Sequence, residues 1–357
     1  MEDRIIPIGG EQWFNINLFD NRLNNFCDTE AVFLSGGQSA IQFILEDIRV
    51  KDDEYILVPS YLCPTILHNF KRLKIRYRFY KINKDLSINL YDVRDNLEKF
   101  KINSIFFIDY FGFYHNQHTI EYLKKIQNQG ITIIEDAVQM LWFNKRNFIG
   151  DYVFNSYRKF IPIDGSIILC NKIKKYEFKK DNYYEKVNCA RIKKTAFQNL
   201  AIGNEGEFLD LYEEAEEEYY KREYINGMDE ASRRMLSKID YKFIFNRRKE
   251  NYFYLHDRLV KNNNVKIIFK KDLIIDNSVL GLPILIDNRD EIRKKLRLDS
   301  IYCPVHWNIL NEKWSNKYVE SRYVSKKIIT LPIDQRYNIN DMERLAAAIE
   351  DVISNIS

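Results

Sequence analysis

Between residues 30 and 170, short apolar runs alternate with stretches whose apolar residues recur at helical spacing, such as residues 39–48. Four of the apolar runs lie at residues 31–37, 54–64, 104–112 and 131–136. Strands joined by helices of about ten residues form a sheet that is mostly parallel, because each helix returns the chain to the same edge. The pattern therefore predicts an α/β fold with a mostly parallel sheet.

The carboxyl ends of parallel strands meet at one edge of a sheet, and ligands bind there. Gly36, Ser60, Tyr110 and Asp136 lie at or just beyond the ends of the predicted strands. Lys159 follows a further apolar segment. We therefore expect these residues to converge on one ligand site.

Two long helical segments follow the alternating region, at residues 205–225 and 239–261. Beyond them, short apolar runs, a charged helix and a closing helix are typical of a small α+β unit. We expect a large α/β domain over residues 1–238, including an N-terminal arm. A small C-terminal α+β domain is expected over residues 239–357.

The balance of charges argues against a nucleic-acid-binding protein, because 55 basic and 51 acidic residues leave a net charge of only +4. No apolar run is long enough to span a membrane, and the N-terminal residues lack the apolar segment of a secretion signal. The five cysteines show no metal-binding spacing, and their odd number indicates reduced thiols. We expect a cytoplasmic protein that uses no metal, nucleic acid or membrane.

Residues 35–41 place two glycines between a predicted strand and a predicted helix. Backbone N–H groups at the beginning of a helix attract anions, and glycine leaves them accessible. Gly37, Gln38 and Ser39 are therefore candidate ligands of a phosphate group. An ordinary strand-to-helix turn gives the same pattern.

Asp136 and Lys159 together indicate pyridoxal 5'-phosphate (PLP). In PLP enzymes a carboxylate pairs with the pyridine nitrogen and keeps it protonated, while a lysine binds the aldehyde covalently and later moves protons. Gln139, about one turn after Asp136, is a candidate partner of the ring's phenolic oxygen, and Ser156 is a candidate phosphate ligand. Alone, Asp136 is equally well explained as a helix cap and Lys159 as a surface lysine.

Two further residues are candidate substrate contacts. Tyr110 follows the apolar run at residues 104–109, and His306 follows a later apolar strand. Both residue types also pack and form hydrogen bonds inside proteins without any catalytic role. A packing role therefore stays open for both.

The order of these segments resembles the DegT-like family of PLP-dependent sugar aminotransferases. The matching segments are residues 37–41 (Gly-Thr-x-Ala-Leu in the family), 58–61 (Val-Pro-Ser-Tyr), 135–139 (Glu-Asp-x-x-Gln), 150–151 (Gly-Asp) and 156–159 (the serine and lysine segment). Residues 304–307 and 331–337 look like the family's C-terminal substrate-side segments. The resemblance covers roughly residues 30–340.

The resemblance implies a fold-type I enzyme that acts as a homodimer, with each active site completed by the neighbouring subunit. It implies transamination from a donor, glutamate by analogy, to a keto group on a nucleotide-linked sugar. Lys159 would be the covalent partner and acid/base. Asp136 would bind the pyridinium and Gln139 the phenolate, while Ser156, Gln38 and Ser39 would hold the phosphate.

The chain departs from the family at three places. The family's glycine-rich stretch after the lysine reads Asp164-Gly165-Ser166 here. Ser156 lies three residues before Lys159, a shorter spacing than the family's, and Cys63 replaces the aromatic residue that stacks on the cofactor ring. A divergent Ser-x-x-Lys branch is therefore the better match. A PLP-dependent sugar dehydratase and a non-catalytic homologue are the alternatives. The retained lysine argues against the first, and the joint presence of Asp136, Gln139 and Lys159 against the second.

Overall fold

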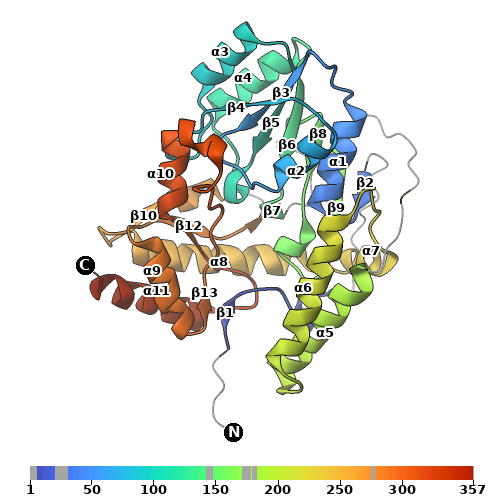
Figure 1. Ribbon diagram of the computed structural model, residues 1–357. Coiled ribbons are helices and arrows are strands. Elements are labelled where there is room, and N and C mark those ends of the chain that lie inside the picture. The colour runs from blue at the N-terminus through green and yellow to red at the C-terminus, as the bar shows by residue number, and fades with distance from the viewer. Residues whose placement is uncertain are drawn as a thin grey trace.

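The computed structural model describes residues 6–20, 31–141, 148–170, 178, 183–274 and 278–356. A seven-stranded sheet forms the centre of its N-terminal part (Figure 1). In spatial order its strands are β2 (Ala31–Leu34), β9 (Ser166–Cys170), β8 (Tyr152–Phe154), β6 (Thr132–Asp136), β5 (Ile102–Ile108), β3 (Tyr55–Pro59) and β4 (Tyr77–Tyr80). Strands β8, β6, β5, β3 and β4 are parallel, whereas β9 is antiparallel to both of its neighbours. The predicted mostly parallel sheet is confirmed.

Four helices connect the parallel strands: α1 (Gly37–Asp47), α2 (Ile66–Arg72), α3 (Leu90–Lys99) and α4 (Gln117–Gln127). Asn89 and Asn116 begin α3 and α4, since each side chain accepts a hydrogen bond from a backbone N–H of the first turn. Figure 1 shows α3 and α4 side by side at the outer end of the sheet. These crossovers bring the carboxyl ends of the parallel strands to one edge.

The C-terminal part is built around an antiparallel sheet of β10 (Lys266–Ile267), β12 (Leu282–Leu285) and β14 (Ile328–Leu331). Around it lie α8 (Tyr241–Leu259), α9 (Arg289–Leu298), α10 (Val319–Lys327) and α11 (Ile339–Ser354). Figure 1 shows α8 running below the large sheet, and it packs on α11 and β12. The apolar core is continuous from the large sheet into this part. The domain boundary after residue 238 therefore stays a prediction.

Two short pairings connect segments that are distant in sequence. Strand β7 (Met140–Leu141) pairs with β11 (Ser278–Val279), and β1 (Ile8–Gly9) of the N-terminal arm pairs with β13 (Ile301–Tyr302). Gly9 has φ = 93°, and a Cβ atom there would lie 2.2 Å from the backbone oxygen of Tyr302. Only glycine permits this close approach, so the arm is fixed to the C-terminal part.

Helices α5 (Tyr183–Leu200) and α6 (Glu205–Lys221) pack on each other as a hairpin, followed by α7 (Glu230–Leu236). The helix expected over residues 205–225 corresponds to α6, which returns along α5. Short 3₁₀ turns lie at Ile16–Leu18, Tyr110–Gly112, Tyr157–Lys159, Lys271–Leu273 and Lys313–Lys317. None of the helices in the described part of the chain is both long and apolar enough to cross a membrane.

Candidate active site

A cavity of about 630 Å³ lies at the carboxyl edge of the large sheet, where it meets the N-terminal arm and the C-terminal part. Most of the residues singled out from the sequence line it together. They are Gly37, Gln38, Asp136, Gln139, Ser156, Lys159 and His306. Gly36, Ser39, Ser60 and Tyr110 are not among the described residues that line the cavity. Of the strand-end residues expected to converge, Asp136 and Lys159 share the site, at the edge where a parallel sheet binds ligands.

Asp136 and Lys159 lie in the same cavity, and the charge of Lys159 acts on the Asp136 carboxyl. Burial raises the pKa of the Asp136 carboxyl to about 7, against the opposing effects of the Val138 N–H, 2.9 Å from Oδ1, and of the Lys159 charge. Burial also lowers the pKa of the Lys159 amine, and the adjacent Arg158 charge lowers it further. Both groups are therefore destabilised in their charged forms. A second cation beside Asp136 would restore its ionisation.

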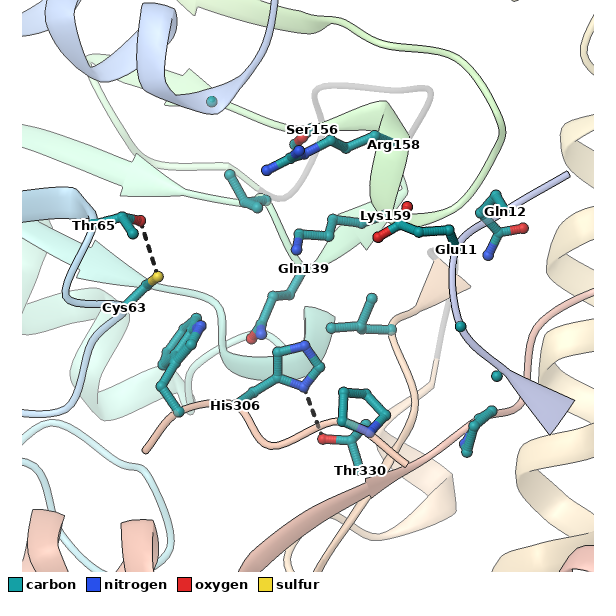
Figure 2. Close-up of a pocket in the computed structure, with 18 of the residues that line it drawn as sticks. Glu11, Gln12, Cys63, Thr65, Gln139, Ser156, Arg158, Lys159, His306 and Thr330 are labelled. Atoms are coloured by element: carbon teal, nitrogen blue, oxygen red, sulfur yellow. Dashed lines mark hydrogen bonds between the residues drawn. The ribbon is translucent and has the colours of Figure 1, made fainter. Parts of the chain in front are cut away.

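A 3₁₀ turn explains how the short Ser-x-x-Lys spacing still brings both side chains into the site. Residues Tyr157–Lys159 form this turn after Ser156, with the Phe160 N–H donating to the Tyr157 carbonyl over 2.9 Å. In a 3₁₀ turn, side chains three residues apart lie on the same side. Ser156 and Lys159 therefore face the same cavity (Figure 2).

The orientation of Gln139 is fixed by a backbone contact. Its Oε1 accepts a hydrogen bond from the Phe111 N–H at 2.8 Å, and Phe111 has the left-handed backbone conformation. With the oxygen used in this way, the amide NH₂ is the group left for a ligand. Gln139 lies between Lys159 and His306 in Figure 2. The site therefore presents a hydrogen-bond donor here.

The beginning of α1 forms one end of the cavity. Gly37 and Gln38 line it, and the Gln38 N–H donates to the Tyr219 hydroxyl over 3.3 Å. The Gln38 side chain is held by Thr65 and Asn69, so a ligand of Gln38 would have to take the place of the Tyr219 hydroxyl at its backbone N–H. Ser39 lies behind this turn, with its Oγ 2.7 Å from that of Ser35.

Tyr110 supports the cavity wall without lining it. Its hydroxyl donates to the Tyr61 carbonyl, and the Tyr61 hydroxyl in turn binds the His306 carbonyl at 2.5 Å and the Trp307 N–H at 2.6 Å. His306 Nδ1 lies 2.9 Å from Thr330 Oγ1. Burial, together with the Lys159 charge, lowers the pKa of His306 to about 3. His306 therefore offers the site a neutral imidazole.

Two further segments that match the family, at residues 135 and 150–151, hold strand β6 in position. Glu135 Oε2 accepts hydrogen bonds from the N–H groups of Ile149 at 2.8 Å and Gly150 at 2.7 Å. Asp151 Oδ2 accepts one from the Ile133 N–H at 2.8 Å. A Cβ atom at Gly150 would lie 2.7 Å from that of Glu135, so the position requires glycine. These residues position Asp136 and do not contact the cavity.

Cys63 lines the cavity, and its Sγ lies 3.1 Å from Thr65 Oγ1. It offers no ring for stacking. Four aromatic side chains nevertheless line the same cavity in the described part of the chain: Tyr219, Tyr220, Tyr302 and Trp307. An aromatic surface is thus present, but from other elements than the sequence comparison indicates.

The wall of the cavity opposite Asp136 and Lys159 is formed by the N-terminal arm, α9 and the segment after β14, and it includes residues that sequence reasoning missed. Glu11 extends from the N-terminal arm toward Lys159 (Figure 2), and its charge opposes the lowering of the Lys159 pKa. Arg336 holds the arm by donating to the carbonyls of Gly10 and Glu11, and it forms a 2.7 Å ion pair with Asp334. No local pattern marks Glu11, because only the pairing of β1 with β13 brings it here.

Two arginines of α9, Arg293 and Arg297, also line the cavity. Arg293 Nε donates to the Cys303 carbonyl at 2.9 Å. Burial lowers the pKa of Arg293, and the neighbouring Arg297 charge adds to this effect. No carboxylate forms an ion pair with either arginine within the described ranges. An anion between them would relieve the repulsion.

The sheet order, the antiparallel β9, the small C-terminal part and a site at the strand ends together define the architecture. Solved structures show that this is the fold of PLP-type sugar aminotransferases, so the predicted fold-type I architecture is confirmed. No family model matches the sequence, and the search of curated proteins gives no match.

Three solved structures illustrate the likeness. DesI with its TDP-sugar product has a TM-score of 0.65 and 15% identity, covering 89% of this chain and 79% of DesI. A DegT DnrJ EryC1 StrS aminotransferase from Brucella abortus has a TM-score of 0.62 and 14% identity, covering 90% and 85%. NtdA from Bacillus subtilis with bound cofactor PMP has a TM-score of 0.64 and 12% identity, covering 91% and 73%.

Proposed function

We propose that this protein is a PLP-dependent aminotransferase that aminates a keto group of a nucleotide-linked sugar, with glutamate as the donor. The observation that carries the proposal is that Asp136 and Lys159, both buried and both with shifted pKa values, line one cavity at the strand ends of a fold-type I architecture. The solved structures with this fold include one that holds a TDP-sugar product and one that holds PMP.

The residues present fit PLP. Asp136 is a buried carboxylate whose ionisation needs a cation, which a protonated ring nitrogen provides. The Gln139 amide suits the phenolic oxygen, and the Ser156 hydroxyl with the first N–H groups of α1 suits the phosphate. When bound, PLP supplies an electrophilic aldehyde and an electron-withdrawing ring that makes the Cα–H of an attached amino acid acidic.

The side chains of the cavity would have separate roles in the reaction. Lys159 has a lowered pKa, so its Nζ is available as a neutral nucleophile and afterwards as a base that moves a proton to and from the substrate. Asp136 keeps the opposite end of the ring protonated. Glu11, on the arm, lies near enough to influence the charge of the Lys159 amine.

The opposite wall supports an anionic acceptor. The cavity volume of about 630 Å³ is in the range of pockets that bind drug-sized ligands, well above the size of an amino acid. Arg293 and Arg297 lack carboxylate partners among the described residues, and guanidinium groups bind phosphate oxygens in a bidentate manner. His306, as a neutral imidazole, is suited to a hydroxyl or carbonyl of the sugar.

The proposal includes a cytoplasmic homodimer with small-molecule substrates and no nucleic-acid or membrane partner. Apolar side chains exposed on the α5–α6 hairpin support a subunit contact. They are Ile192, Leu200, Ile202 and Leu209. Light scattering on the purified protein tests this part, and a monomer at micromolar concentration would contradict it.

The decisive experiment is an absorbance titration of the cofactor-free protein with PLP. We expect a visible band that Lys159→Ala abolishes, and we expect glutamate to bleach that band in the wild type. A nucleotide-linked keto sugar should then restore the band. Wild type that gives no band would favour a non-catalytic homologue. A band that no amino donor bleaches would exclude transamination.

A further inference from the structure

Arg158 is a cation that the proposed chemistry does not yet use. It lies next to Lys159 in the 3₁₀ turn and lines the same cavity. Figure 2 shows its side chain running beside Ser156, above that of Lys159. No carboxylate forms an ion pair with it in the part of the chain that the structure describes. Arg158 is therefore a positive charge directed into the site that has no carboxylate in direct contact, although the charges of Asp164 and Glu11 stabilise it from a greater distance.

Tyr219 connects Arg158 to the beginning of α1. The Arg158 guanidinium carbon lies 5.2 Å from the centroid of the Tyr219 ring, a distance typical of a cation–π contact. The hydroxyl of the same ring accepts the Gln38 N–H and lies 2.8 Å from where a Cβ atom at Gly36 would be. One aromatic ring therefore spans the guanidinium and the first turn of the helix.

Apart from Arg158, the hydrogen-bond donors at this end of the cavity are neutral, and the Glu216 carboxylate, which also lines the cavity, adds no positive charge. Ser156 offers a hydroxyl, and α1 offers backbone N–H groups with the partial positive charge of a helix beginning. A phosphate dianion taken from water into such a site needs a full counter-charge. Lys159 is unsuitable, because its lowered pKa favours the neutral amine that the chemistry needs.

Other arginines of the cavity are held by different partners. Arg248 donates to the carbonyls of Val279 and Leu280 and to Gln335. Arg336 is paired with Asp334. Their contacts direct both toward the C-terminal part. Arg158 is left as the cation beside Ser156.

We propose that Arg158 binds the phosphate group of PLP, acting with the Ser156 hydroxyl and the first N–H groups of α1. This inference rests on the proposed function. It also gives the short Ser-Tyr-Arg-Lys segment a chemical meaning, because a single turn then supplies the phosphate hydroxyl, the phosphate cation and the reactive amine.

The test compares PLP with pyridoxal, which has the same aldehyde and ring but no phosphate. Dissociation constants for both are measured by absorbance on cofactor-free wild type, Arg158→Gln and Arg158→Lys. Both aldehydes react with Lys159, so any effect of the substitution on this amine cancels in the ratio of the two constants. Arg94→Gln, at an exposed site on α3, is the matched control.

We expect Arg158→Gln to reduce the preference for PLP over pyridoxal by about 10- to 100-fold, the range for loss of charge-assisted hydrogen bonds. Arg158→Lys should recover part of it, and Arg94→Gln should change nothing. Inorganic phosphate should raise the melting temperature of wild type more than that of Arg158→Gln.

An unchanged ratio in Arg158→Gln overturns the inference. Equal weakening of both aldehydes also overturns it, because that result indicates a purely structural role through Tyr219. These outcomes leave the proposed function intact, since PLP still binds in the wild type. Wild type that binds neither aldehyde would instead reject the proposed function, and this inference with it.

Discussion

The two walls of the cavity are built in different ways. The cofactor wall comes from the end of β6 and the 3₁₀ turn at Tyr157–Lys159, which lie close together in the sequence. The opposite wall combines the N-terminal arm with α9 and the segment after β14, which only long-range pairing brings together. The first wall is buried, which shifts the pKa values of Asp136 and Lys159, whereas the second is rich in arginine.

This difference predicts a division of labour. Changes in the cofactor wall should affect both halves of a transamination, because each half uses the same ring and the same lysine. Changes in the opposite wall should affect the acceptor alone. The following experiments, from the largest expected effect to the smallest, test that division.

Asp136→Asn should have the largest effect. It keeps the shape of the side chain but removes the charge that would stabilise a protonated ring nitrogen. We expect the rate of band bleaching by glutamate and the rate of its restoration by the acceptor each to fall about 10³-fold. The matched control is Asp85→Asn, an exposed acid between β4 and α3 that does not line the cavity. An effect on only one half-reaction would contradict the division.

The raised pKa of Asp136 predicts that the stability of the cofactor-free protein depends on pH, and the same variant tests this. The pKa of Asp136 is raised on folding from an ordinary value near 4 to about 7, so the folded state favours the protonated acid. Wild type should therefore lose stability relative to Asp136→Asn as pH rises from about 4 to 7, with no further loss above that. The difference should reach about 4 kcal/mol, or about 1000-fold in the unfolding constant. Urea unfolding of wild type and Asp136→Asn across this pH range measures the difference in stability. A difference that does not change with pH would refute the raised pKa of Asp136.

Gly9→Ala should detach the arm and so damage only the opposite wall. A Cβ atom would lie 2.2 Å from the Tyr302 carbonyl oxygen, and φ is 93°. We expect kcat/KM for the acceptor to fall about 10- to 100-fold while the PLP dissociation constant stays unchanged. Gly130→Ala is the control, because φ is 94° there but no atom lies within 4 Å. Equal loss of PLP binding in Gly9→Ala would show that the walls are not independent.

Arg297→Gln should give the smallest effect of the four. It removes one of two guanidinium groups, so we expect KM for a nucleotide-linked acceptor to rise about 10-fold. The glutamate half-reaction should be unaffected. Lys295→Gln, on the same helix but outside the cavity, is the control. A changed response to glutamate would assign the arginine pair to the donor.

Much of the cofactor wall could be predicted from the sequence, because its signals are local. The strand that ends at Asp136 has an apolar run before Glu135, and the helix that begins at Gly37 follows a glycine-rich turn. Gln139 and Ser156 lie within short, fixed distances along the chain of these elements. All of them line the cavity. Their ligands stay predictions until the titrations are made.

The expectation for Tyr110 shows the limit of that reasoning. A tyrosine after a strand can either point into the site or hold a neighbouring segment in position. Here its hydroxyl donates a hydrogen bond to the Tyr61 carbonyl. Which of these occurs depends on where residues 304–307 lie in space. The sequence does not contain that information in a local form.

The sequence alone determined the parallel sheet and the order of Asp136 and Lys159 along its edge, because hydrophobic periodicity and strand ends are local properties. Tertiary structure alone decided that Glu11 and the α9 arginines share this cavity, because those contacts need pairing across about 300 residues. It also decided that Arg158 faces the cavity beside Lys159. That follows from the geometry of one 3₁₀ turn packed against Tyr219.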